Sequence, residues 1–250
     1  MSAAARLFAA VLLLQTTGAR DSRPLPDPQP FFEAVRANLA RSQDEQNRFA
    51  YKERRTDLNL NPFGRMGTGE TRVIAVMPVE GGKAVVRRLI ERDGQPVTDA
   101  PPLRRELRMT ERGRSIVDDV VATLDVKIDH RDVLNGRDAI VLTFKAKRDA
   151  QPRTREGRLV RGFAGEIWID ELAKEVMRVD AKAIDDLTFG FGMLGRLNEG
   201  ATVSVRRQRI DGDLWLPVSI RFDGEGRALL FRKLTVNFAL DWFDYQRTSF

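Results

Sequence analysis

The C-terminal third of the chain alternates apolar and polar side chains, and this period-two pattern constrains the fold more than any other feature. In 214–222, LWLPVSIRF, every second residue is apolar, and 234–242 repeats the pattern. Residues 140–144 add a third stripe of the same kind. Such alternation is typical of β-strands with one apolar face. An antiparallel sheet built from these strands must cover that face.

Similar alternating runs occupy much of the remaining chain. Turn sequences such as Gly81-Gly82, Asp93-Gly94 and Asn135-Gly136 separate them, which indicates antiparallel hairpins. We therefore predict about ten strands, and a sheet of that size must curl or split. The predicted strands are 48–60, 71–79, 83–94, 126–136, 137–147, 165–170, 174–184, 200–210, 214–222 and 228–243.

Two regions have a helical period instead. Phe31, Val35 and Leu39 recur every four residues, which predicts an amphipathic helix against the sheet. Apolar residues at similar spacing predict helical structure over 102–123, and the arginine-rich segment 148–161 is expected to be a polar surface loop. The fold class is therefore α+β.

The first residues indicate export. An early arginine, an apolar run from Leu7 to Leu14 and small residues before Arg20 predict a signal peptide over 1–19. A proline-rich linker follows at 20–30, and 31–250 is expected to form one domain. The chain has no cysteine, so it lacks disulfides and the residue that lipoproteins acylate. We expect a soluble, monomeric periplasmic protein.

Candidate catalytic groups are few. The single histidine, His130, cannot build a metal site alone. The two carboxylates within each of the doublets Asp118-Asp119 and Asp185-Asp186 point in different directions, which is unfavourable for paired acid–base chemistry. We interpret Asp118-Asp119 as the solvated side of a helix. The sequence predicts no enzyme activity, no cofactor and no metal site. A net charge of +6 is spread along the chain, which favours a solvated surface over nucleic-acid binding.

The glycine-rich run 188–200 does not match a phosphate-binding loop, because the spacing of its glycines fails the dinucleotide fingerprint. Apolar residues separate these glycines. The run is either a lid over an apolar cavity or a buried plug. The candidate lid residues are Phe189, Phe191, Met193 and Leu194.

Two short helices can cover only part of the apolar face of a sheet of about ten strands. Part of the apolar face is therefore expected to line a hollow that binds lipids or acyl chains. A filled core is the alternative, and it would leave an interaction module of the cell envelope without lipid cargo. The predicted lining residues are Ile140, Leu142, Phe144, Leu214, Leu216, Val218, Ile220, Phe222, Leu234, Val236, Phe238 and Leu240.

The order of motifs adds a family resemblance. GEIWID (165–170), EVMRVDA (175–181) and DGDLWLPVSIRF (211–222) follow an N-terminal helix and a meander of strands. This arrangement resembles the periplasmic lipoprotein carriers of the LolA/LolB-like superfamily, in particular uncharacterised outer-membrane lipoprotein-sorting proteins of environmental bacteria. The likeness spans about 31–245 and rests on structural motifs.

The resemblance implies a strongly curved antiparallel sheet, an incomplete β-barrel with helices as its lid. It also implies non-covalent binding of acyl chains in the hollow and transient partners in the envelope membranes. Pro217 would then lie at a gap in strand pairing that tolerates its missing N–H. The best-known carriers have an arginine in the cavity that governs lid closure. No arginine of this sequence stands out as its equivalent, so the cargo is a free lipid, a glycolipid or a lipoprotein tail.

Overall fold

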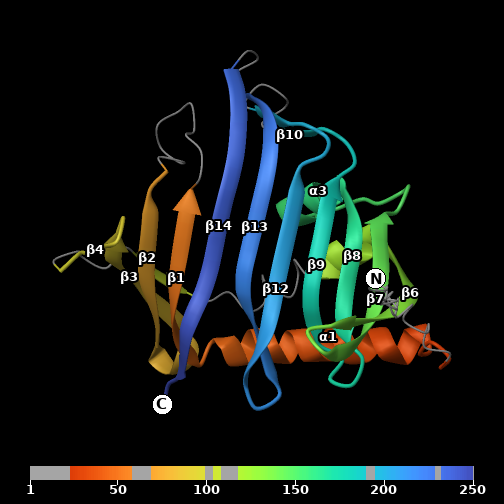
Figure 1. Ribbon diagram of the computed structural model, residues 1–250, viewed down its shortest axis with the longest axis horizontal. Coiled ribbons are helices and arrows are strands. Elements are labelled where there is room, and N and C mark those ends of the chain that lie inside the picture. Colours follow the sequence, from red (N-terminus) through yellow and green to blue (C-terminus); the bar gives the residue numbers. More distant parts are fainter. Residues whose placement is uncertain are drawn as a thin grey trace, which may run out of the picture.

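The computed structural model describes residues 23–57, 69–98, 104–107, 118–189, 195–228 and 232–249. In these residues fourteen strands form one antiparallel sheet (Figure 1). In chain order they are β1 (Phe49–Asp57), β2 (Thr71–Val79), β3 (Ala84–Arg92), β4 (Gln95–Pro96), β5 (Arg104–Leu107), β6 (Leu124–Leu134), β7 (Arg137–Ala146), β8 (Phe163–Asp170), β9 (Val176–Ala183), β10 (Leu187–Phe189), β11 (Gly195–Leu197), β12 (Thr202–Asp211), β13 (Leu214–Ala228) and β14 (Arg232–Arg247).

The sheet is curved and does not close into a barrel. Its strand order is β4-β3-β2-β1-β14-β13-β12-β9-β8-β7-β6, with β5, β10 and β11 paired beside this path. The first long strand, β1, pairs with the last, β14, so that Phe49 faces Arg247. The predicted α+β class with an incomplete barrel is confirmed, and the strands are somewhat more numerous than the ten expected.

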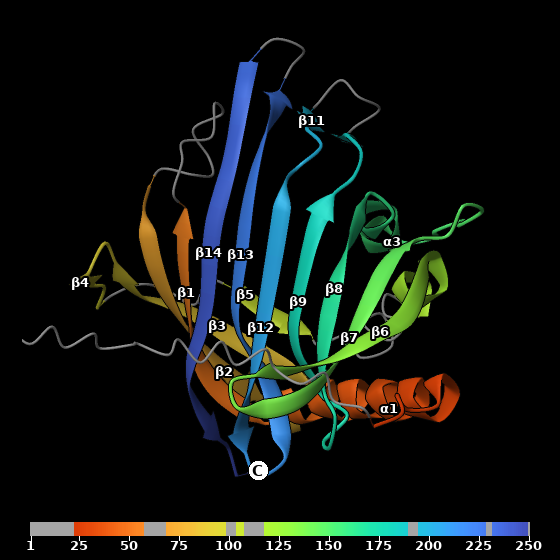
Figure 2. The same ribbon diagram turned by 45° about the vertical axis from the view of Figure 1, so that its right-hand side comes forward.

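Helix α1 (Pro28–Gln46) runs across the lower ends of the strands, on one side of the sheet (Figures 1 and 2). Asp27 caps it by accepting a hydrogen bond from the backbone N–H of Gln29, and Pro28 suits the first turn. Phe31 and Val35 are buried, as their four-residue spacing predicts. We call the face of the sheet against which α1 packs the inner face.

The two faces of the sheet carry separate cores, because neighbouring residues of a strand point to opposite sides. On the inner face Ile140 and Leu142 pack with Ile169 against α1. On the outer face Val141 packs with Trp168, in a cluster completed by Ala139, Met177 and Trp215. Strand β7 is therefore apolar on both sides in its middle.

Two predicted elements are wrong. Residues 104–107 belong to strand β5, not to a helix, because their backbone pairs with β3 from Ala84 to Arg87. The predicted loop 148–161 contains helix α3 (Arg155–Val160), whose N-cap Thr154 accepts a hydrogen bond from the N–H of Gly157. Of the predicted helix 102–123, only residues 118–123 are helical in the part of the chain that the structure describes.

Some predictions concern residues outside the described ranges. These are the signal peptide, part of the linker, residues 108–117 and the lid residues Phe191, Met193 and Leu194. The short helix η1 (Glu80–Gly82) occupies the predicted Gly81-Gly82 turn between β2 and β3.

Pro217 lies at a β-bulge. Arg206 pairs with Ser219 and Arg207 pairs with Pro217, so Val218 is the extra residue of β13. Pairing of β13 with β14 begins only at Ser219. The missing N–H of Pro217 therefore costs no ladder hydrogen bond on that side, as the sequence predicted.

Candidate functional site: an apolar floor with an arginine rim

Cross-strand pairing aligns apolar residues of the inner face in one unbroken row. The row crosses the sheet from β6 to β14 at one level. Its members, each paired with the next, are Ile128, Leu142, Ile167, Val179, Val205, Ile220 and Leu240. The same row then continues through β1, β2 and β3 as Arg55, Arg72 and Arg92.

Helix α1 covers the part of this row on β6 to β9. Phe31 and Val35 of the helix pack with Ile140 and Leu142 of β7 in one buried cluster. Three further residues of the row pack against this cluster, namely Ile128, Ile167 and Val179. Ile140 is fully buried and Leu142 is 3% exposed. These two predicted lining residues thus lie beneath the helix.

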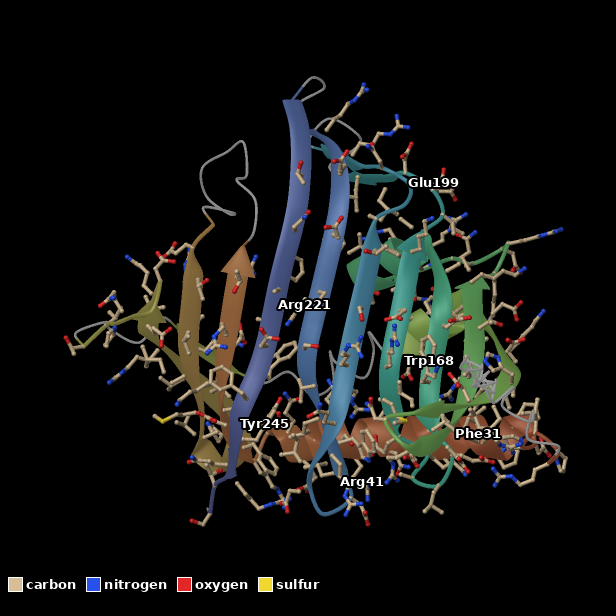
Figure 3. All side chains as sticks on the ribbon, in the orientation of Figure 1. Phe31, Arg41, Trp168, Glu199, Arg221 and Tyr245 are labelled. Atoms are coloured by element: carbon tan, nitrogen blue, oxygen red, sulfur yellow. The ribbon has the colours of Figure 1, made fainter. Side chains whose placement is uncertain are left out.

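The lower end of β13 is also filled. Leu214 and Leu216 pack with Phe49, and Leu216 is fully buried. Tyr245 lies beside this cluster and donates a hydrogen bond from its hydroxyl to the carbonyl oxygen of Pro217, at 2.7 Å. Burial raises the pKa of the Tyr245 hydroxyl. Figure 3 shows Tyr245 at the same end of the sheet as α1.

Beyond α1 the inner face carries six half-buried apolar side chains, which we call the apolar floor. They are Val203, Val205, Ile220, Phe222, Phe238 and Leu240. None of the six belongs to the cluster formed with α1, as far as the described part of the chain shows. The rings of Phe222 and Phe238 stack with centroids 5.5 Å apart. Four predicted lining residues lie here.

Strands β10 and β11 approach the upper end of the floor. Leu187 and Leu197 pack together, and Phe222 packs against them. Gly226 allows the approach, because a Cβ there would lie 2.0 Å from the carbonyl oxygen of Arg196. The candidate lid segment connects these two short strands, and the backbone of Phe189 pairs with Gly195.

The other predicted lining residues are placed only in part. Phe144 is 7% exposed, and Val218 is half-buried at the bulge. Leu234 and Val236 pair with Gly226 and Gly224, while their side chains lie outside the described part. The contact of all these residues with a ligand stays a prediction.

Arg55, Arg72 and Arg92 form what we call the arginine rim, at the end of the row. Glu70 pairs with Arg72 at 2.8 Å and with Arg92 at 2.7 Å. The guanidinium of Arg55 lies over the ring of Phe238, 5.4 Å from its centroid. The rim therefore adjoins the aromatic pair of the apolar floor. Sequence reasoning missed it, because the three arginines come from three separate strands.

A buried polar cluster fixes α1 to the sheet. The carboxylate of Glu175 is fully buried and accepts hydrogen bonds from the hydroxyl of Ser42 at 2.9 Å and from Arg207 at 3.2 Å. Burial lowers the pKa of Arg207, although Glu175 opposes the shift. Arg41 lies 3.5 Å from the same carboxylate. We call this set the α1 anchor.

Three of the candidate catalytic groups have structural partners. Asp119 accepts hydrogen bonds from the backbone N–H groups of Arg153 and Thr154, which lower its pKa. Asp186 pairs with Arg196. His130 is exposed on β6, and its Nδ1 lies 2.8 Å from Asp129. In the described ranges no group of three His, Cys, Asp or Glu residues is placed to hold a metal ion.

A hollow of about 800 Å³ lies over β7, β8, β9 and β12. Most of its lining residues belong to the outer face, by their place in the strand alternation. Charged side chains border it, including Lys145, Glu166, Arg178 and Lys182. Its position, mainly on the outer face, and its charged border separate most of this hollow from the apolar floor, with Val203 common to both. No helix in the described part of the chain is long and apolar enough to cross a membrane.

Comparisons with known proteins found similarity only at the level of structure. No family model matches the chain. No curated protein matches it either. A solved domain designated an outer membrane lipoprotein-sorting protein domain from Vibrio parahaemolyticus is 12% identical, with a TM-score of 0.38, and the match covers 88% of this chain and 94% of that one.

Two further solved structures are similar over most of their length. A LolA superfamily protein from Nitrosomonas europaea is 11% identical, with a TM-score of 0.34 and coverage of 87% and 94%. The MucA/MucB complex of Pseudomonas aeruginosa gives 10% identity and a TM-score of 0.24, with coverage of 84% and 93%. The similar structures thus include the superfamily that the sequence resembles, and the likeness concerns the fold alone.

Proposed function

We propose that the protein is a periplasmic carrier that binds lipids or lipoprotein acyl chains non-covalently on the apolar floor. The observation that carries the proposal is the half-buried stripe across β12, β13 and β14. A monomeric protein gains free energy when such a surface is covered. The predicted signal peptide supports location in the periplasm.

The energetics suit a reversible carrier. Each methylene transferred from water to an apolar surface contributes about 0.8 kcal/mol. Roughly ten buried methylenes therefore offset an association cost within the range of about 4 to 15 kcal/mol. An acyl chain of ordinary length exceeds that number of methylenes. Binding then needs no covalent step.

The test is lipid uptake by two matched variants. Ile220→Asp places a charge on the apolar floor, and Ser219→Asp places the same charge on the outer face of the same strand. We expect the first to weaken binding of a fluorescent fatty acid at least tenfold and the second to leave it nearly unchanged. Circular dichroism checks that both variants are folded.

Native mass spectrometry of the exported protein, purified without detergent, gives an independent readout. The proposal predicts co-purifying lipid in the unmodified protein. A clean ligand-free mass together with no fatty-acid uptake would contradict it. That result would favour the alternative, an envelope interaction module whose inner face is filled.

A further inference from the structure

We infer that one corner of the molecule docks on a lipid bilayer by inserting three exposed aliphatic side chains, which we call the apolar corner: Leu25, Val133 and Leu172. Six large hydrophobic side chains are exposed among the described residues, and these are three of them, with exposed fractions of 42%, 63% and 86%. Scattered exposed hydrophobics are normal on a soluble protein, whereas a group of them marks an interaction surface. The inference goes beyond the proposed function, because it concerns where the protein meets a membrane.

The side chain of Arg131 joins two of the three segments. Its guanidinium donates hydrogen bonds to the carbonyl oxygens of residues 23 and 24, at 2.9 and 3.2 Å, directly before Leu25. It also donates to both carboxylate oxygens of Glu171, at 2.7 Å each. Leu172 follows Glu171 in the chain, so Leu25 and Leu172 lie on either side of one guanidinium.

Val133 belongs to the same corner through Asp138. The two residues pair directly on β6 and β7, so their side chains lie on the same face of the sheet. The carboxylate of Asp138 accepts a hydrogen bond from Arg23 at 2.9 Å, and its carbonyl oxygen accepts one from the N–H of Glu171. A hollow of about 660 Å³ is lined by Arg23, Asp138 and Leu172 together with other residues. The three exposed side chains therefore share one surface.

The apolar corner lies where strands end. Leu25 precedes α1, Val133 is the last residue but one of β6, and Leu172 occupies the turn between β8 and β9. Asn38 of α1 donates a hydrogen bond to the carbonyl oxygen of Ala173 in the same turn, and Figure 1 shows that turn at the α1 end of the sheet. A flat bilayer can reach side chains placed at the end of the strands.

The area of the corner favours a bilayer over a protein partner. Three aliphatic side chains with these exposures offer on the order of 200 to 300 Å² of apolar surface. A stable protein–protein interface takes roughly 800 Å² from each partner. Weak membrane binding needs less, because it grows with the apolar area inserted and lipids adapt to the shape of the protein.

Charges of both signs border the corner. Arg137, Lys174 and Asp138 line the hollow beside Leu172. Zwitterionic head groups carry one positive and one negative charge each, so they can pair with both kinds of side chain. The partner that fits best is therefore the surface of a bilayer with zwitterionic lipids.

The test is flotation of the exported protein with phosphatidylcholine vesicles. We expect reversible binding at millimolar lipid that persists in about 0.5 M salt, because ions do not screen the insertion of apolar side chains. Binding should weaken about tenfold or more in the corner variant, Leu25→Ser/Val133→Ser/Leu172→Ser. Binding should change less than about twofold in the matched control, which removes the other three exposed hydrophobics, Met77→Ser/Val121→Ser/Ile184→Ser.

A single fluorescent label gives a second readout. The chain has no cysteine, so Leu172→Cys provides its only thiol for a dye whose emission shifts to the blue in an apolar environment. We expect a blue shift when vesicles are added. The same dye on Ile184→Cys, outside the corner and 44% exposed before substitution, should show none.

Several results would overturn the inference. They are absence of vesicle binding by the unmodified protein, loss of binding in salt, and equal weakening in the two triple variants. A dimer in light scattering that only the corner variant dissociates would show that a second copy covers the corner. Fatty-acid uptake keeps the two hypotheses apart, because the corner variant should still take up fatty acid and Ile220→Asp should still bind vesicles. The vesicle measurement on the unmodified protein decides even if a variant fails to fold.

Discussion

The α1 anchor gives the most quantitative prediction. The Glu175 carboxylate has no exposed surface, and the Arg207 side chain beside it is 10% exposed. Glu175→Met removes one partner and leaves the Arg207 charge buried without a counterion. Removal of one member of a buried ion pair costs about 3 to 5 kcal/mol. In a domain of this size that loss lowers the unfolding midpoint by roughly 6 to 20 °C.

Urea unfolding, followed by the fluorescence of the buried Trp168 and Trp215, measures this loss. The matched control is Arg41→Met, because Arg41 contacts the same carboxylate from a side chain that is 53% exposed. Its cost should be about 0 to 1 kcal/mol. The double variant Glu175→Met/Arg207→Met should recover part of the loss, since no buried charge remains unpaired. Equal costs for Glu175→Met and Arg41→Met would refute the reasoning.

Three further predictions follow from other contacts. Asp119→Asn removes a carboxylate whose pKa is lowered by backbone hydrogen bonds. The ionised carboxylate stabilises the folded state above about pH 4, and this stabilisation is lost as the pH falls through the lowered pKa. The midpoints of thermal unfolding of the variant and of the unmodified protein should therefore converge between about pH 5 and 2. A difference between the midpoints that stays constant with pH would count against this account. Tyr245→Phe removes the hydrogen bond to Pro217 and should cost about 1 kcal/mol in urea unfolding. Because burial raises the pKa of Tyr245, its stabilisation is present below about pH 10 and lost as the pH rises, so the variant should be less sensitive to alkali; equal sensitivity would contradict the assignment. Gly165→Val places a Cβ 2.0 Å from the carbonyl oxygen of Asp180, and should cost about 1 to 3 kcal/mol or more, whereas a midpoint in urea equal to that of the unmodified protein would show that the strands are not so close.

Hairpins could be predicted from the sequence because their signals are local. Asn135 and Gly136 have φ values of 53° and 75°, and Asp93 and Gly94 have 49° and 78°. These are the left-handed conformations that such turns require. The spacing of Phe31 and Val35 likewise predicted the buried stripe of α1, since both residues lie on one short segment.

One of the two wrong elements, the predicted helix that includes 104–107, illustrates the limit of local patterns. Leu103 and Leu107 are four residues apart, a spacing that also occurs in strands by chance. The backbone of 104–107 pairs with β3, so tertiary pairing overrides the local period. The α1 anchor was missed for a related reason. In the sequence Glu175 and Arg207 resemble ordinary charged residues of solvated strands, and only folding brings both close to Ser42 of α1.

The site itself depends on the strand pairing with the largest sequence separation in the described part of the chain, that of β1 with β14. Arg55 reaches the apolar floor because β1 pairs with β14, where Arg55 faces Leu240. No local signal in the sequence specifies that pairing. Sequence patterns could therefore predict four floor residues, which lie on the alternating strands β13 and β14, and could not predict the rim.

The α1 anchor and the apolar floor are linked by the position of one helix. A buried carboxylate must keep its hydrogen-bond partners, and Glu175 takes Ser42 as one of them from α1. Asn38 adds a hydrogen bond to the carbonyl oxygen of Ala173, at 2.8 Å. A shift of α1 toward the middle of the strands would break both contacts. The anchor therefore holds α1 across the strand ends (Figure 1), and the surface that the helix does not reach is the surface that we propose binds the ligand.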